Sequence, residues 1–318
     1  ARFALTNGEL CVEDLGSTNG TFVNHQRIDE STPVSAGDVI HLADHEFRLM
    51  RDAGVHSSTA DSGVSADTVI GVNTLPRKFP LQMAALIDLL ENDRVTTYYQ
   101  EIRTSAGELF GWELLGRSTH PELTEGPGQL FSLASALNSE VRLSRLLRRQ
   151  SFEAASRAKL KQPLFFNNHP AECEDFDDLL SELSSLRQRF PDLELVFEVH
   201  EAAVTDLTVM ARVRKELDRM QIRLAYDDFG AGQARLLELV EVPPDFLKFD
   251  ISLVRGLEDT ESAKYRRLSA LNGLISDMGI KTLAEGIETR HAAMLCREIG
   301  IDFVQGFYYS RPREIGLG

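Results

Sequence analysis

Polar side chains of the types that bind metal ions recur at the ends of predicted strands in the second part of the chain. Successive members of this set are 54, 31, 29, 21, 37 and 20 residues apart, which suits one site residue for each strand–helix unit. In a barrel of such units the active site lies at the carboxyl ends of the strands, so these side chains are expected to meet there. The set comprises Glu113, Asn167, Glu198, Asp227 with Asp228, Lys248 with Asp250, Glu285 and Gln305.

The chemistry of this set is that of hard divalent cations. Carboxylate and amide oxygens suit Mg²⁺, Mn²⁺ or Ca²⁺ rather than zinc, and Cys11, Cys173 and Cys296 are too widely spaced to indicate a thiolate site or a disulfide framework. Two neighbouring carboxylates can hold two cations about 3.5–4 Å apart, which stabilises the attacking and leaving oxygens of a displacement at phosphorus. Lys248 is then expected to position the attacking water or to neutralise phosphate charge.

The stretch AYDDFGAGQARL, residues 225–236, places the two aspartates side by side before a glycine-rich loop. On a regular strand, Asp227 and Asp228 are expected to point to opposite faces. A single acidic residue at a strand end is more often a helix cap or an ion-pair partner than a metal ligand. Convergence of the whole set at one end of a barrel is therefore the feature that favours a metal site.

Strand-like segments alternate with helical patterns after residue 75, which predicts an α/β fold of the (β/α)8, TIM-like barrel type. The first two segments are joined by residues 103–108, too few for a crossover helix, so they are expected to pair as an antiparallel hairpin. Helical patterns cover 130–158 and 211–220, and a third stops at Gly279. The strand segments are 95–102, 109–115, 164–167, 193–199, 222–228, 246–250, 282–285 and 303–309.

The first 51 residues are predicted to form a small all-β unit. Alternating runs at 10–12, 21–23, 39–42 and 46–49 are separated by turn-forming clusters. The composition then shifts to Ser, Ala, Gly, Asp and Thr, which is typical of a flexible linker. The predicted organisation is a β unit over 1–51, a linker over 52–76 and a barrel over 77–318.

The charge balance is acidic, with 49 Asp and Glu against 34 Lys and Arg, which argues against a nucleic-acid binder. Cations held by carboxylates can still attract a compact anionic ligand. No apolar run approaches the roughly 18 residues of a membrane span, and no signal peptide is visible. We therefore expect a cytoplasmic location without membrane contact, and the start at Ala1 within a strand-like run indicates a piece of a longer protein.

Eight motifs in the second part resemble those of the EAL domain of cyclic di-GMP phosphodiesterases, in that family's order, over residues 79–314. Each is weak alone, but the ordered set is specific. They are YYQEI (98–102), WELLGR (112–117), FNNHP (166–170), FEVHE (197–201), DDFGAG (227–232), LKFD (247–250), LAEGIET (283–289) and QGFYYSRP (305–312). The resemblance implies a barrel with one antiparallel strand pair, hydrolysis of cyclic di-GMP to linear pGpG, and a homodimer.

The same resemblance implies a role for each matched residue. The implied metal ligands are Glu113, Asn167, Glu198, Asp227, Asp228 and Glu285, with Asp227 shared by two cations. Mg²⁺ or Mn²⁺ would serve the reaction, and Ca²⁺ would inhibit it. The implied catalytic residues are Lys248, which would contact the nucleophilic water, with Glu285 and Glu113. The implied substrate contacts are Gln100, Leu115, Arg117, Asp250 and Gln305, the last also completing the metal and water shell.

Some positions depart from the family pattern. Gln233-Ala-Arg235 replaces Tyr-Ser-Ser in the loop that Glu201 would brace, and Glu101 replaces a proline. His200 replaces a threonine and is expected to face away from Glu198, as a packed or hydrogen-bonding residue rather than a ligand. The altered loop predicts low activity and leaves an alternative open, a catalytically weak or inactive cyclic di-GMP receptor. A lyase or isomerase of the enolase kind also sets carboxylates and a lysine on barrel strands, but the ordered motifs disfavour it.

The first part resembles the second half of a forkhead-associated (FHA) domain, a phosphothreonine-binding β-sandwich. The resemblance rests on VEDLGSTNGTFVNHQRI and AGDVIHLADHEFRL, in which Ser17, Thr18 and Asn19 match part of the ligand-binding edge. The upstream motifs that carry the main phosphate contacts in that family are absent. A phosphothreonine-bearing protein partner is therefore expected only where the missing half is present, and a structural remnant and a sensor both remain open.

Overall fold

The computed structural model describes residues 1–49 and 79–316, apart from 7–8, 16–19, 25, 29, 36–37, 43–44, 125, 201–205, 231–235 and 258. Within these ranges the chain divides into two compact units, Ala1–Asp88 and Leu89–Gly318. The partly matched FHA edge at Ser17, Thr18 and Asn19 lies outside the described residues, as does the predicted linker. In the described part of the chain, no helix is both long and apolar enough to cross a membrane.

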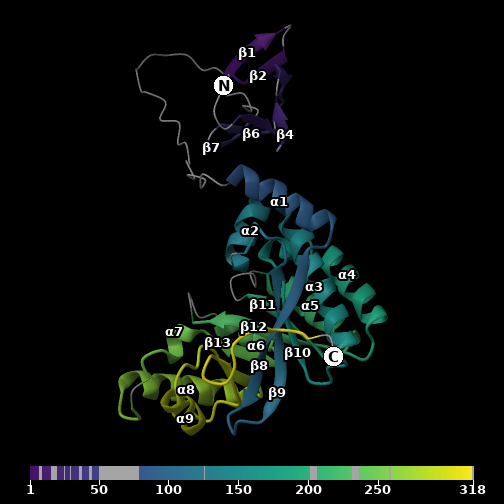
Figure 1. Ribbon diagram of the computed structural model, residues 1–318. Coiled ribbons are helices and arrows are strands. Elements are labelled where there is room, and N and C mark those ends of the chain that lie inside the picture. The colour runs from purple at the N-terminus through teal and green to yellow at the C-terminus, as the bar shows by residue number, and fades with distance from the viewer. Residues whose placement is uncertain are drawn as a thin grey trace, which may run out of the picture. The chain divides into compact units, whose positions relative to one another are not determined.

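The first unit contains two antiparallel sheets (Figure 1). Valine and isoleucine alternate with polar residues in its strands, and Val12, Val23, Ile28, Val34 and Ile40 form a buried cluster. One sheet has the order β1-β2-β5 and the other β4-β3-β6-β7. The strands are β1 (Arg2–Thr6), β2 (Glu9–Glu13), β3 (Thr21–Val23), β4 (Gln26–Ile28), β5 (Thr32–Pro33), β6 (Val39–Leu42) and β7 (His45–Arg48). The all-β prediction for this part is confirmed.

The second unit is a closed barrel, which confirms the predicted fold class. Its sheet runs in the order β15-β14-β13-β12-β11-β10-β9-β8-β16, and pairing of β15 with β8 closes it. The predicted hairpin is present, because β8 runs antiparallel to β9 (Figure 1). β8 is also antiparallel to β15. The strands are β8 (Val95–Thr104), β9 (Leu109–Ser118), β10 (Leu164–Asn167), β11 (Leu195–His200), β12 (Ile222–Phe229), β13 (Phe246–Phe249), β14 (Lys281–Ala284), β15 (Phe303–Val304) and β16 (Arg313–Glu314).

Helices follow most of the parallel strands, and their apolar faces cover the outside of the barrel with one large buried cluster. Capping residues set several ends: the side chain of Asp175 accepts a hydrogen bond from Asp178 N at 3.0 Å, and Gly300 ends a helix with φ of 87°. The helices are α1 (Phe79–Glu91), α2 (Pro127–Ala136), α3 (Glu140–Arg157), η1 (Pro170–Glu174), α4 (Phe176–Arg189), α5 (Leu207–Arg219), α6 (Leu236–Glu241), α7 (Ile251–Val254), α8 (Ala263–Asp277) and α9 (Arg290–Ile299).

Two predicted elements differ in the structure. The single helical pattern over 130–158 is two helices, α2 and α3, because the chain turns at Asn138 with φ of 47°. The predicted strand over 303–309 is a strand only at Phe303–Val304. After it, the chain bends at Gly306, where a Cβ atom would lie 2.2 Å from the backbone N and O of Ile287. That close approach brings the segment after β15 against the segment after β14.

Candidate active site

The candidate site is a polar layer built directly above an apolar layer inside the barrel. Ile102, Phe165, Val196, Ala225, Phe246 and Leu283 form a buried cluster, against which Phe303 packs. Because side chains in a strand alternate, the residue two positions further toward the barrel mouth faces inward as well. In the parallel strands these residues are Asn167, Glu198, Asp227, Lys248, Glu285 and Gln305, and in the reversed strand β8 the residue is Gln100. The strand pattern therefore places this part of the predicted set in one layer.

Lys248 stands at the centre of this layer with almost no exposed side chain. Its Nζ lies 2.6 Å from Glu198 Oε1, 2.8 Å from Glu285 Oε1 and 3.0 Å from Asp227 Oδ1. Glu113 Oε1 is 3.8 Å away. The ammonium group of Lys248 thus faces four carboxylates, each from a different strand or strand end.

Asp228 adds a fifth carboxylate, and the expectation that it points away from Asp227 is wrong. Its φ is 58°, in the left-handed region, and the pairing of β12 with β13 slips between Tyr226 and Phe229. Such a bulge breaks the alternation of side chains. Asp227, Asp228 and Glu285 consequently each place a carboxylate oxygen within 4.8 Å of the others'.

The ionisation of the layer reflects this crowding. Burial raises the pKa of Glu198 well above its ordinary value, and Lys248 offsets the effect only in part. Burial, with the charges of Asp227 and Glu113, raises the pKa of Glu285 to about 8. Burial and then the charge of Asp227 raise the pKa of Asp228. Burial alone would lower the pKa of Lys248, but the surrounding carboxylates raise it well above its ordinary value.

These residues fit a divalent cation. Five carboxylates near one lysine leave an excess of negative charge in a largely buried space. Burial, and then the charges of Asp227 and Glu113, raise the pKa values of Glu198 and Glu285, which disfavours their ionised forms. Carboxylate and amide oxygens are the donors that Mg²⁺, Mn²⁺ and Ca²⁺ prefer. Among the described residues, Gln305 Oε1 is also a buried acceptor without a hydrogen-bond partner. A bound cation or its water would satisfy it.

The amide side chains of Gln305 and Asn167 fix the carboxylate of Glu113 through hydrogen bonds. Gln305 Nε2 donates to Glu113 Oε2 at 2.5 Å and lies 3.2 Å from Gln100 Oε1. Asn167 Nδ2 donates to the other oxygen of Glu113 at 3.2 Å. The carboxylate of Glu113 is thus fixed by two neighbours before any cation is added.

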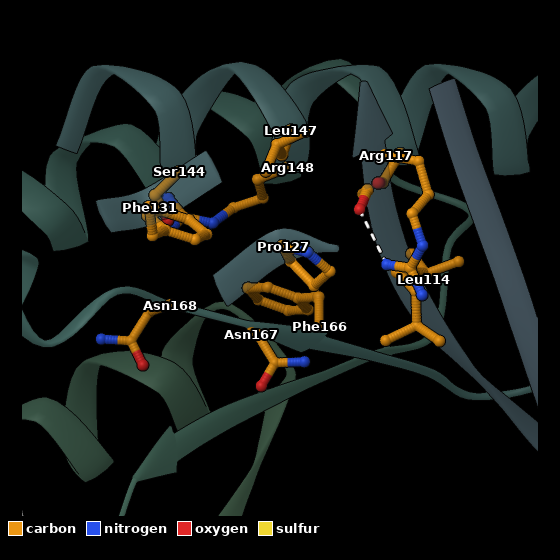
Figure 2. A pocket seen from close by; sticks show the side chains of 13 residues that line it. Leu114, Arg117, Pro127, Phe131, Ser144, Leu147, Arg148, Phe166, Asn167 and Asn168 are labelled. Carbon is orange, nitrogen blue, oxygen red and sulfur yellow. Dashed lines mark hydrogen bonds between the residues drawn. The ribbon is translucent and has the colours of Figure 1, made fainter. Parts of the chain in front are cut away.

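Two pockets adjoin the polar layer. One, of about 240 Å³, is lined by Gln100, Glu113, Glu285, Gln305 and the half-exposed Phe307, among others. The second, of about 220 Å³, lies between β9, β10, α2 and α3. Figure 2 shows Arg117 and Asn168 on opposite sides of this second pocket, with the ring of Phe166 between them in that view.

Arg117 and Arg148 both line the second pocket, and Arg148 is paired with Glu172 and Glu182. Arg117 Nη1 donates to Gly116 O at 2.9 Å, its guanidinium lies 5.7 Å from the centre of the Tyr98 ring, and burial lowers its pKa. Leu115 lines the same pocket.

Asp250, another predicted substrate contact, has a structural task. Its Oδ1 caps α7 by accepting a hydrogen bond from Ser252 N at 2.9 Å.

The order and geometry of these residues match one known family. A model of the EAL domain matches residues 83–312, and a model of the FHA domain matches residues 1–43. The chain belongs to the EAL domain family. The FHA match covers a short first segment that includes most of the two antiparallel sheets.

Several curated relatives of this EAL chain are named as cyclic di-GMP phosphodiesterases. The cyclic di-GMP phosphodiesterase RocR of Pseudomonas aeruginosa is 29% identical over 252 residues, covering 75% of this chain and 63% of RocR. The cyclic di-GMP phosphodiesterase PdeL of Escherichia coli is 29% identical over 231 residues, covering 70% and 64%. The chain thus spans less than two thirds of the length of either relative.

Solved EAL structures share the barrel. BlrP1 of Klebsiella pneumoniae, in complex with manganese and cyclic di-GMP, is 28% identical with a TM-score of 0.63, covering 71% of this chain and 57% of BlrP1. A calcium complex of BlrP1 is 26% identical with a TM-score of 0.62, covering 75% and 64%. The FimX EAL domain of Pseudomonas aeruginosa, bound to cyclic di-GMP, is 20% identical with a TM-score of 0.65, covering 74% and 97%, and shows the fold.

Two predicted features of the EAL barrel lie outside the described residues: Glu201, and the altered loop residues Gln233, Ala234 and Arg235. His200, next to the first of these, places its Nε2 3.3 Å from Asp228 Oδ2. Sequence reasoning did not single out Phe131 and Asn168 in the second pocket, or Ser310, which contacts Gln100. The motifs FNNHP and QGFYYSRP contain two of these three residues and were the signal available.

Proposed function

We propose that this chain hydrolyses one phosphodiester bond of cyclic di-GMP, giving linear pGpG, with two divalent cations at the barrel mouth. The observation that carries the proposal is the cluster of five carboxylates around Lys248 in a chain of the EAL family. The BlrP1 complexes with manganese or calcium and cyclic di-GMP support the same ligand and metal class. In the reaction, a water oxygen bonds to phosphorus, the bond from phosphorus to the ribose oxygen breaks, and that oxygen gains a proton.

The first cation would be held by Glu113, Asn167, Glu198 and Asp227, and the second by Asp227 and Asp228, with Glu285 and Gln305 completing the shell. When bound, the cations would lower the charge on the phosphate and favour ionisation of the attacking water. In this proposal Lys248, whose Nζ pairs with three carboxylates, would contact the attacking water or neutralise charge on the phosphate. Positioning of this kind lowers the barrier by orienting the reactants beforehand.

The rest of the ligand would extend over the two pockets. The pocket beside Arg117 combines the rings of Phe131 and Phe166 with the amides of Asn167 and Asn168. A guanine base presents a flat apolar face and a polar edge, and these groups suit both. Gln100, Leu115, Arg117 and Asp250 stay predicted substrate contacts, and the homodimer also stays a prediction.

The decisive experiment follows pGpG formation by chromatography, with the chain incubated with cyclic di-GMP and Mg²⁺ or Mn²⁺. We expect turnover that falls at least about a hundredfold in Glu113→Gln, because a metal ligand is lost. The matched control is Glu194→Gln, since that exposed glutamate pairs with Arg223 at the start of β11, away from the mouth.

A second function is favoured by one sequence feature. The substitutions at 233–235 fit a receptor, since binding tolerates a poorly organised loop better than catalysis does. Calorimetry of cyclic di-GMP binding in Ca²⁺ tests it. Tight binding without pGpG under either Mg²⁺ or Mn²⁺ would establish the receptor and reject the hydrolase. If the altered loop limits catalysis, restoring Tyr-Ser-Ser at 233–235 is expected to raise the rate of pGpG formation above that of the unaltered chain.

A further inference from the structure

The segment Ser310–Ile315, here called the C-terminal strap, lies along the edge of β8 beside the barrel mouth. β15 covers the lower part of that edge, with Phe303 opposite Thr104 and Val304 opposite Arg103. β16, within the strap, covers the upper part, with Arg313 opposite Tyr99 and Glu314 opposite Tyr98. The strap thus continues the line of β15 after the bend at Gly306, and it closes the last seam of the barrel next to the candidate site.

Glu101 fastens the strap to β8. Its carboxylate is buried and receives Arg103 Nε at 2.7 Å and Arg313 Nη2 at 3.1 Å, so a β8 arginine and a strap arginine share one anion. The backbone N of Glu101 also donates to Ser310 Oγ at 3.1 Å. Charge-assisted bonds of this geometry are stronger than neutral ones, particularly when the anion is out of water.

The fastened strap contacts the site through one backbone carbonyl. Ser310 O accepts a hydrogen bond from Gln100 Nε2 at 2.9 Å. A carbonyl can only accept, so it fixes the amide of Gln100 with its NH₂ toward the strap and its Oε1 toward the barrel interior. There, Gln100 Oε1 accepts a hydrogen bond from Gln305 Nε2 at 3.2 Å. The NH₂ group of Gln305 also donates to Glu113 Oε2.

The orientation of Gln305 follows from its two neighbours. Gln100 Oε1 and Glu113 Oε2 are both acceptors, so Gln305 must present its NH₂ to them, and its Oε1 is left as the buried acceptor without a partner in the described structure. Rotation of Gln100 by half a turn would instead set NH₂ against NH₂. Loss of the bond to Ser310 O would therefore free Gln100 to rotate and would leave Glu113 as the one acceptor of these two that still holds the NH₂ of Gln305.

We propose that the C-terminal strap is a positioning element for the site: Glu101 and Arg313 hold it against β8, and the carbonyl of Ser310 orients Gln100 and, through it, Gln305. The inference rests on the proposed function for its catalytic consequence, since there Gln305 completes the metal and water shell. Arg313 is a positioning residue that acts without touching substrate, and its half-exposed side chain makes it a tolerant site for substitution.

The test compares Arg313→Gln with the control Glu314→Gln. Both residues lie in β16, but Glu314 pairs with Thr96 Oγ1 at 2.7 Å and has no contact with Glu101 or Gln100 among the described bonds. The first readout is the ¹H–¹⁵N spectrum of the side-chain amides of Gln100 and Gln305. These signals are expected to shift or broaden in Arg313→Gln and to stay in place in Glu314→Gln.

The second readout is kinetic. We expect kcat to fall about tenfold in Arg313→Gln and in Glu101→Gln, with KM changed less, because the shift affects the reacting centre more than the substrate's remote contacts. Arg313→Lys, which keeps the charge, is expected to recover most of the loss. Melting temperatures of Arg313→Gln and Glu314→Gln should be similar, whereas a purely structural role for Arg313 predicts a lower melting temperature in Arg313→Gln and no selective fall in kcat.

Unchanged amide signals in a folded Arg313→Gln would overturn the proposal, as would equal shifts in the Glu314→Gln control. A wild-type chain that neither binds nor cleaves cyclic di-GMP would instead reject the proposed function. In that case the amide signals still decide whether the strap orients Gln100 and Gln305, because they are recorded without ligand.

Discussion

At the scale of single residues, the molecule places carboxylates where they repel each other. Glu198, Asp227 and Glu285 all lie within 3.0 Å of one buried ammonium group, which cannot neutralise them all. Burial is the main cause of the raised pKa values of Glu198 and Glu285, and the charges of Asp227 and Glu113 raise them further. A site that is electrostatically unfavourable when empty is well suited to binding cations, because binding removes the repulsion.

The pH dependence of stability follows from Glu285. Its folded pKa of about 8 lies above its ordinary value of 4.5, so between these values the folded barrel holds more protons than the unfolded chain. The stability that this carboxyl contributes is therefore fully present below about pH 4.5 and lost as pH rises toward 8. We expect the melting temperature in EDTA to fall by at least about 2–4 °C over this range, the shift that corresponds to roughly 1 kcal/mol.

Divalent cations should cancel that loss, because they bind the ionised folded site. The measurement is a series of melts at pH 5 to 8 in EDTA and in Mn²⁺, with Glu285→Gln as the comparison. If wild type and Glu285→Gln give parallel curves in EDTA, the raised pKa of Glu285 does not control this stability.

At the scale of elements, the bulge in β12 decides the site. A regular strand would present one aspartate to the interior, but the left-handed residue Asp228 turns a second one toward the same space. Aspartate and asparagine tolerate this conformation better than branched side chains do, because their short polar groups bond locally. Position 228 therefore needs a residue that tolerates a left-handed backbone and that also carries a carboxylate for the metal site.

Two substitutions at this position separate the requirements. Asp228→Asn is expected to keep the fold and to weaken Mn²⁺ binding at least about tenfold, since loss of even an indirect metal partner costs 10–100-fold. Asp228→Val is expected to weaken binding similarly and to lower the free energy of unfolding by a further 1–2 kcal/mol, approximately, from the left-handed backbone. Calorimetry of Mn²⁺ and urea unfolding give the two quantities. Equal stability of the two variants would show that the bulge carries no strain.

At the scale of the whole molecule, the chain consists of two units with separate cores. The buried cluster of the first unit lies between Val12 and Ile40, whereas the barrel clusters lie between Ile102 and Ile315. These three clusters share no residue. We therefore expect each core to form without the other, in line with the separate family matches.

Removal of residues 1–76, which contain both antiparallel sheets, tests this independence. A chain of residues 77–318, the predicted barrel domain, is expected to fold and to bind cyclic di-GMP in Ca²⁺ with a Kd within about threefold of that of the full chain. Circular dichroism and calorimetry provide the readouts. A barrel that is folded but binds more than about tenfold more weakly would show that the first unit contributes to the site.

The sequence by itself determined the barrel, its antiparallel first pair and the candidate residues. The barrel, its first pair and the polar set at the strand ends follow from local signals: the alternation of apolar and polar residues, the short connection at 103–108, and polar residues at strand ends. The candidate substrate contacts Gln100, Leu115 and Arg117 rest on the resemblance to the EAL family. The tertiary structure decided what depends on distant contacts. Sequence alternation predicted that Asp228 points away, and the slip between β12 and β13 reversed that. Ser310 and Arg313 gained their relation to Gln100 and Glu101 only because the barrel closes, which brings residues more than 200 positions apart into hydrogen-bond distance.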